Sequence, residues 1–145
     1  MRPMPTATMD EDGAREMLAL LSPEFGVPPP RLRWIMGARA WYYYNLREIR
    51  VGPNSWGGVE NCVIHEFAHH VAQSLDGNYG HRGRFFEYLC EVARVWYGDE
   101  SRYGWSYEYK SLQKRAASCG MTRKRGQHDS LHVIRQTGER STCAA

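Results

Sequence analysis

The first stretch of helical periodicity lies near the start of the chain. Asp10 is followed by two acidic residues and then by apolar side chains at helical spacing, namely Ala14, Met17, Leu18 and Leu21. An N-cap residue, an acidic first turn and one apolar face together predict an amphipathic helix. Pro23 and the prolines at 28–30 lack the backbone donor that a helix needs, so we expect them to end this helix.

The same apolar spacing recurs in two later segments. Residues 59–75 predict a central helix, and residues 83–97 predict another helix that ends at Gly98. A short helix over residues 106–117 is a further expectation. Glycine, serine, threonine and basic residues then continue without sustained periodicity, and we expect residues 120–145 to form a mobile, basic tail.

Between the prolines and the central helix the pattern changes to one typical of strands. Residues 31–36 alternate basic and apolar side chains, residues 41–44 are Trp-Tyr-Tyr-Tyr, and residues 48–51 follow a short turn. Aromatic and β-branched residues favour strands, so we predict a small, mostly antiparallel sheet of three short strands. We interpret the aromatic run as strand residues that pack on a helix rather than as a ligand-binding group.

The composition fits one folded domain with a charged extension. With 145 residues, 42% of them hydrophobic, the chain can form one ordinary core, and we assign residues 1–119 to it. The charge is uneven: residues 110–145 carry eight Lys or Arg against two Asp or Glu, whereas residues 1–109 carry 11 against 14. Such a tail can bind nucleic acid weakly and non-specifically through phosphates, or it can simply keep a protein in solution.

No feature of the sequence predicts contact with a membrane. No apolar stretch approaches the ~20 residues that span a bilayer, and acidic residues stand where a signal peptide has its hydrophobic region. The four cysteines form no C-x-x-C pair; they are Cys62, Cys90, Cys119 and Cys143. We therefore expect a cytoplasmic protein with reduced thiols.

The central helix carries the sequence His65-Glu66-Phe67-Ala68-His69. Positions four apart lie on one face of a helix, so both imidazoles can bind one metal ion. Glu66 lies beside that face, where it can take a proton from a water molecule held by the metal. The pattern indicates a catalytic zinc site. The metzincin class is excluded, because Ala72 and Leu75 stand where that class has Gly and His.

A catalytic zinc ion usually takes three protein ligands and keeps its fourth position for water. His81 is the first candidate for the third ligand, because it follows a Gly-rich turn and directly precedes the next helix. Glu87 and Glu91 on that helix are the alternatives. His70 points about 100° away from His69 around the helix, which favours a surface role or an indirect role behind the ligands.

These residues resemble the SprT-like (Spartan-type) metallopeptidase domain. The H-E-x-x-H helix, a spacer of eleven residues and the segment His81-Arg82-Gly83-Arg84-Phe85 are similar to that family's third histidine in an H-G-x-x-F-like motif. The resemblance spans about residues 34–96, and it departs at Arg82, where the family usually has Gly. The sequence also lacks the zinc ribbon of many members, so the resemblance does not imply their DNA-directed role.

The resemblance implies a small zincin-like α+β domain, in which the active-site helix packs on the short sheet and an edge strand borders the substrate cleft. A peptide could add to that edge as a further strand.

The combined expectation is a zinc-dependent metallopeptidase. Zn²⁺ would be held by His65, His69 and His81, and Glu66 would activate the water that attacks a peptide or protein substrate. Three tyrosines are candidate donors to the oxyanion, and none is assigned: Tyr79, Tyr103 and Tyr107. The alternative is a catalytically idle, zinc-stabilised module that binds DNA or protein, including an antirestriction-type role. Glu66 argues against it, since a structural site has no use for an acid beside an open coordination position.

Overall fold

The computed structural model describes residues 9–98 together with Tyr103 and Lys114. The elements in that part of the chain follow in the order α1 (Glu11–Phe25), β1 (Arg31–Trp34), β2 (Trp41–Tyr43), β3 (Glu48–Val51), α2 (Val59–Asp76) and α3 (Phe85–Tyr97). The predicted α+β class is confirmed. Apart from Lys114, the expected helix at 106–117 and the expected tail at 120–145 lie outside the described residues.

Helix α1 begins where the sequence predicts and ends later than predicted. The carboxylate of Asp10 accepts a hydrogen bond of 2.8 Å from the backbone N–H three residues on. The helix then continues through Pro23 to Phe25, so the expectation that Pro23 ends it was wrong. Phe25 is 1% exposed and its ring lies 5.7 Å from that of Phe67. Burying this ring contributes roughly 1.5–3 kcal/mol, which offsets the roughly 3 kcal/mol that proline costs in a helix.

The sheet is mixed rather than mostly antiparallel. Its strand order is β1-β3-β2, in which β2 and β3 are antiparallel and β1 and β3 are parallel. The prediction failed because β1 does not pair with the strand that follows it, but joins the far side of β3. The close approach of these two strands requires Gly52, where an added Cβ would lie 1.5 Å from the carbonyl oxygen of Ile35.

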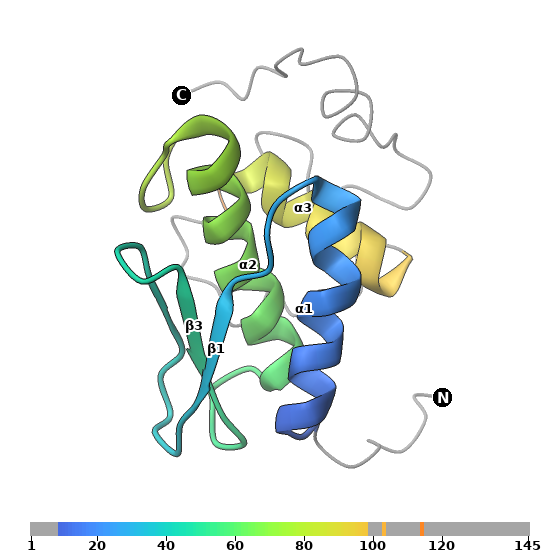
Figure 1. The fold of residues 1–145 in the computed structure, drawn as a ribbon, viewed down its shortest axis with the longest axis vertical. Coiled ribbons are helices and arrows are strands. Elements are labelled where there is room, and N and C mark those ends of the chain that lie inside the picture. Colours follow the sequence, from blue (N-terminus) through green and yellow to red (C-terminus); the bar gives the residue numbers. More distant parts are fainter. Residues whose placement is uncertain (1–8, 99–102, 104–113, 115–145) are drawn as a thin grey trace.

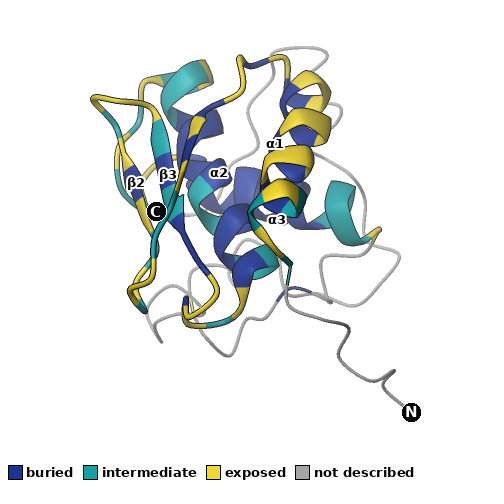
Figure 2. Ribbon diagram, turned by 60° about the horizontal axis from the view of Figure 1, so that its bottom comes forward, coloured by how far each residue is buried: buried dark blue, intermediate teal, exposed yellow. Residues whose placement is uncertain are grey.

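Helix α2 occupies the centre of the molecule. It contacts β2 and β3 on one side and α1 and α3 on the other, so that it lies between the sheet and the other two helices (Figure 1). Leu32, Ile49 and Tyr42 are paired across the three strands and are all buried. Figure 2 shows the burial concentrated on the surfaces turned toward α2 and the exposed residues on the outer face of α1. The apolar side chains that predicted the central helix therefore lie in the core.

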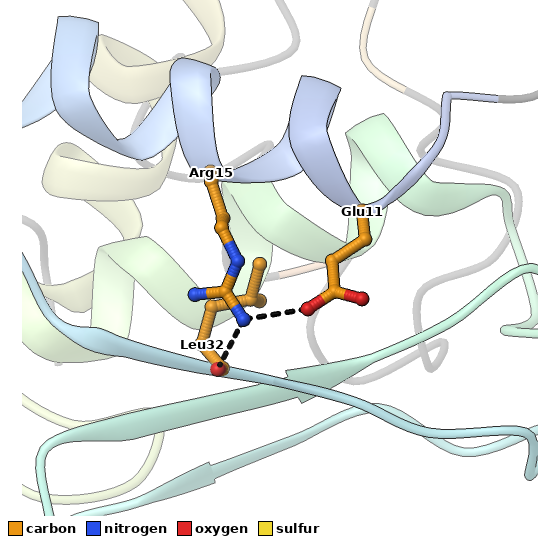
Figure 3. Close-up of polar contacts among 3 residues, drawn as sticks. All are labelled: Glu11, Arg15 and Leu32. Carbon is orange, nitrogen blue, oxygen red and sulfur yellow. Dashed lines mark hydrogen bonds and ion pairs between the residues drawn. The ribbon is translucent and has the colours of Figure 1, made fainter.

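A polar contact links α1 to the sheet. Arg15 donates through Nη2 to a carboxylate oxygen of Glu11 at 2.6 Å and to the backbone carbonyl of Leu32 in β1 at 3.4 Å (Figure 3). An exposed ion pair of this kind contributes at most about 1 kcal/mol to stability. Its structural effect is to occupy one backbone acceptor of β1, which is an edge strand of the sheet.

Two further expectations concern the cysteines and the membrane. Cys62 and Cys90 are buried within helices α2 and α3, as expected. None of the described helices is long and apolar enough to cross a membrane.

Candidate metal centre

Three histidines from two parts of the chain meet in one place. His65 and His69 lie one turn apart on α2, with ring centroids 5.0 Å apart, and His81 comes from the turn between α2 and α3. The ligand atoms of these three side chains all lie within 4.8 Å of one another. We call this group the histidine cluster. The sequence named the same three residues as the metal ligands.

The turn after α2 brings His81 back to the helix. Helix α2 ends at Asp76, and Gly77 adopts the left-handed conformation with φ 68° that closes many helices. Tyr88 of α3 donates to the carboxylate of Asp76 at 2.8 Å, which fixes the second helix against the end of the first. Phe85, the first residue of α3, is fully buried and its ring lies 4.4 Å from His69. The cluster thus rests on an apolar floor.

The geometry of the cluster fits a divalent metal ion. The Nε2 atoms of His65 and His81 are 3.2 Å apart. Two nitrogens bound to one tetrahedral zinc at roughly 2.0–2.1 Å would be separated by about 3.3 Å. Burial, together with the nearby His65 and His81, lowers the pKa of His69 to about 2. The imidazole is therefore neutral at ordinary pH, which is the form that binds a metal. Three imidazoles suit zinc and other first-row divalent ions, so the donor set alone does not fix the metal.

The backs of two of these rings are held by tyrosines. The hydroxyl of Tyr44, just after β2, lies 3.0 Å from Nδ1 of His69, and the hydroxyl of Tyr103 lies 3.4 Å from Nδ1 of His65. Partners of this kind orient metal-binding histidines and select the ring nitrogen that faces the metal. The sequence interpretation placed Tyr44 among packing aromatics and gave Tyr103 no role. No local signal marks either residue, since each is distant in sequence from the histidine it contacts.

The tyrosine at position 44 also reaches the third histidine. Its hydroxyl accepts a hydrogen bond of 2.7 Å from the backbone N–H of Gly80, the residue directly before His81. Burial raises the pKa of Tyr44, so its hydroxyl stays protonated. One oxygen atom therefore contacts both the helix and the turn that supply the candidate ligands. Tyr79, which the sequence named as a candidate oxyanion donor, is 57% exposed and packs on Tyr44, and Tyr107 lies outside the described residues.

Glu66 opens onto the same cleft as the histidines. The cleft has a volume of about 510 Å³, and its lining includes Glu66 and the whole histidine cluster. Glu66 is partly exposed. The lining also includes residues of β2 and of the segment before it, and residues of the loop before α2. The structure thus places a carboxylate in the open space beside three potential metal ligands.

The two alternative ligands have other partners. Arg84 donates to Glu87 at 2.8 Å and Arg94 donates to Glu91 at 3.0 Å, and both carboxylates are buried. Neither belongs to the group of potential ligands that the described residues bring together. The geometry therefore favours His81 over both glutamates as the third ligand.

His70 has no surface role. It is fully buried, with Nδ1 2.8 Å from the hydroxyl of Tyr42 and with Nε2 donating to the carbonyl of Pro28 at 2.7 Å. The surface alternative was therefore wrong, because this side of α2 faces the sheet and the connection after α1.

In comparisons with protein-family models, with curated proteins and with solved structures, no match to this chain was found. The function is therefore inferred from the chemistry of the site.

Proposed function

We propose that this chain is a zinc-dependent metallopeptidase similar to the SprT-like domain, with His65, His69 and His81 as the metal ligands and Glu66 as the general base. The observation that carries the proposal is the shared cleft: three imidazole donors and one carboxylate border the same open space. A water molecule and a substrate can both reach that space.

The number of donors separates a catalytic site from a structural one. Structural zinc sites are closed by four protein ligands, whereas catalytic sites have three and leave one position for water or substrate. Among the described residues the cluster contains three donors and no fourth. A site that only stabilised the fold would gain nothing from the opening beside Glu66. This supports an enzyme over an idle zinc-stabilised module.

Several residues of the cleft have a role in the proposed reaction. Zinc held by His65, His69 and His81 would lower the pKa of a bound water toward ~7 and would polarise a carbonyl group. Glu66 takes the proton from the attacking water and returns it to the amine that leaves, which is general base and then general acid catalysis. Tyr44 and Tyr103 hold the rings of His69 and His65 in place from behind.

The sheet supports a peptide as the substrate. Among the described strands β2 pairs with β3 alone, and its residues Trp41 and Tyr42 line the cleft. An extended peptide that added to this edge would form backbone hydrogen bonds that accept many sequences. It would also carry one peptide bond past the histidine cluster.

The proposal is tested by removing the base while keeping the metal. The Glu66→Gln variant should retain one zinc per chain by elemental analysis and lose hydrolysis of a reduced, unfolded protein by about 10²–10⁴-fold. Glu24→Gln is the matched control, because Glu24 is an exposed carboxylate of α1 away from the cleft. Equal activity in wild type and Glu66→Gln would refute the role of Glu66. Zinc binding without hydrolysis in the wild type, across a broad panel of substrates, would favour the idle module.

A further inference from the structure

An exposed tryptophan borders the cleft beyond the histidine cluster. Trp56 lies in the loop before α2, lines the cleft and is 73% exposed. Its neighbours in the lining include Arg39 and Trp41, and the guanidinium of Arg39 lies 4.2 Å from the centre of the Trp41 ring. The wall on this side is thus rich in indole surface that a bound molecule could cover.

The exposure of Trp56 does not come from a loosely held backbone. Its N–H donates to the carbonyl of Ala38 at 2.9 Å, and its own carbonyl accepts a hydrogen bond of 3.0 Å from the thiol of Cys62 on α2. Ser55, immediately before it, accepts from the N–H of Gly52 at 3.0 Å. The loop therefore presents a large apolar side chain from a fixed backbone, which costs little ordering entropy when a ligand binds.

The hydrogen bond between Trp56 and Cys62 indicates how far Trp56 lies from the bond that is cleaved. Its carbonyl is bonded to Cys62, which precedes Glu66 by four residues, a rise of about 6 Å along a helix. An extended peptide advances about 3.3 Å per residue. If an extended peptide runs along α2 with one peptide bond beside Glu66, the residue about two positions away therefore lies against Trp56.

We propose that Trp56 forms a substrate subsite for a bulky apolar or aromatic side chain, about two residues from the bond that is cleaved. The inference rests on the proposed peptidase function. A volume of about 510 Å³ lies within the roughly 300–1,000 Å³ of typical ligand pockets and exceeds what one peptide group fills. An unfolded segment, which exposes the side chains that a folded protein buries, has the chemistry that this wall fits.

The charge of the cleft favours a peptide over a nucleic acid. Binding a single strand combines stacking on aromatic rings with several Lys or Arg contacts to phosphates. Among the described residues that line the cleft, Arg39 is the single Lys or Arg, and Glu66 is an acid. The cleft therefore offers little positive charge to neutralise the phosphates of a nucleic acid.

The test combines cleavage and binding with the full-length chain. In zinc-loaded wild type, products from a library of unfolded peptides should show aromatic or bulky apolar residues enriched about two positions from the cut. Trp56→Ala should lower kcat/KM for such peptides by about tenfold or more and leave alanine-substituted peptides nearly unchanged. Trp56→Phe should restore most of the preference. Tyr43→Ala is the control, since Tyr43 is an exposed aromatic residue of β2 that does not line the cleft.

Binding separates this inference from the peptidase proposal. Fluorescence anisotropy of a labelled ten-residue peptide with a central Phe-Phe pair, and of its Ala-Ala counterpart, is measured on Glu66→Gln and on Glu66→Gln with Trp56→Ala. Suppose that the wild type cleaves no peptide, that the Phe-Phe peptide binds more tightly than the Ala-Ala peptide, and that Trp56→Ala removes this difference. The peptidase proposal then fails and the subsite stands. The subsite would be overturned by cleavage without this preference for bulky apolar residues, or by equal or undetectable binding of both peptides. It would also be overturned if Trp56→Ala weakened only the binding of a single-stranded oligonucleotide.

Discussion

Replacing Tyr44 by phenylalanine removes one oxygen atom from behind the histidine cluster. That oxygen lies 3.0 Å from Nδ1 of His69 and accepts the N–H of Gly80 at 2.7 Å. When Nε2 of His69 faces a metal, Nδ1 carries the proton and donates it to Tyr44. The hydroxyl then accepts two hydrogen bonds, one from a ligand on α2 and one from the residue before His81.

The size of the effect follows from these two bonds. Each hydrogen bond contributes about 0.5–1.5 kcal/mol net, so losing both costs about 1–3 kcal/mol. At about 1.4 kcal/mol per tenfold change, zinc affinity should fall by about 5–150-fold. Removing outer partners of metal ligands typically costs about 10–100-fold. Because Tyr44 is only partly buried, water can replace part of the loss, and we expect about tenfold.

The assay is a zinc titration in competition with a chelating dye, run beside thermal unfolding of the metal-free protein. Tyr43→Phe is the control, because the neighbouring tyrosine points its ring toward Arg50, 3.8 Å away, and does not line the cleft. The visible spectrum of the cobalt-substituted protein should change in Tyr44→Phe and stay the same in Tyr43→Phe. An unchanged zinc affinity in Tyr44→Phe, or an equal loss in both variants, would refute this reasoning.

Two further predictions concern the third ligand and the strand crossing. His81→Ala should lose tight zinc binding, whereas Glu91→Gln should keep it while lowering the free energy of unfolding by up to about 3 kcal/mol, since it breaks a buried ion pair. Elemental analysis measures the zinc content of both variants, and denaturant unfolding measures their stability. If Glu91→Gln lost zinc and His81→Ala kept it, Glu91 would replace His81 as the third ligand. Gly52→Ala should prevent folding, because its Cβ would meet the carbonyl of Ile35 at 1.5 Å, whereas Gly37→Ala has open space. Circular dichroism measures both, and a folded Gly52→Ala would contradict the close approach.

The candidate ligands were predictable because their geometry is mostly local. His65 and His69 are four residues apart on a helix whose apolar face was evident, so one face had to carry both rings. His81 follows shortly after Gly77, where the chain leaves α2, so it can lie only near the end of that helix. The tyrosines behind the cluster follow from no such rule. Tyr44 meets His69 only because β2 packs on α2, and the sequence does not encode that distance as a pattern.

The errors in the fold have the same origin. Helix periodicity gave α2 and α3 to within two residues, but Pro23 was judged by local propensity while the burial of Phe25 extended the helix past it. The three strands were also predicted correctly, whereas their mostly antiparallel pairing was not, because alternation shows which face of a strand is buried and not which neighbour it joins. Pairing of β1 with β3 depends on the approach of Ile35 to Gly52, a contact between distant residues.

The sheet holds α2 from the side opposite the other helices, and Gln73 is the residue that connects this support to the site. Its carbonyl oxygen accepts the hydroxyl of Tyr42 at 2.6 Å, and its amide nitrogen donates to the backbone carbonyl of Tyr44 at 3.2 Å. The same Tyr42 hydroxyl lies 2.8 Å from the buried ring of His70. The end of β2 is therefore fixed to α2 through side chain and backbone at once. Because Tyr44 sits at that end and contacts His69, the placement of the sheet sets the orientation of a candidate metal ligand, and the strand-to-helix packing becomes part of the candidate site.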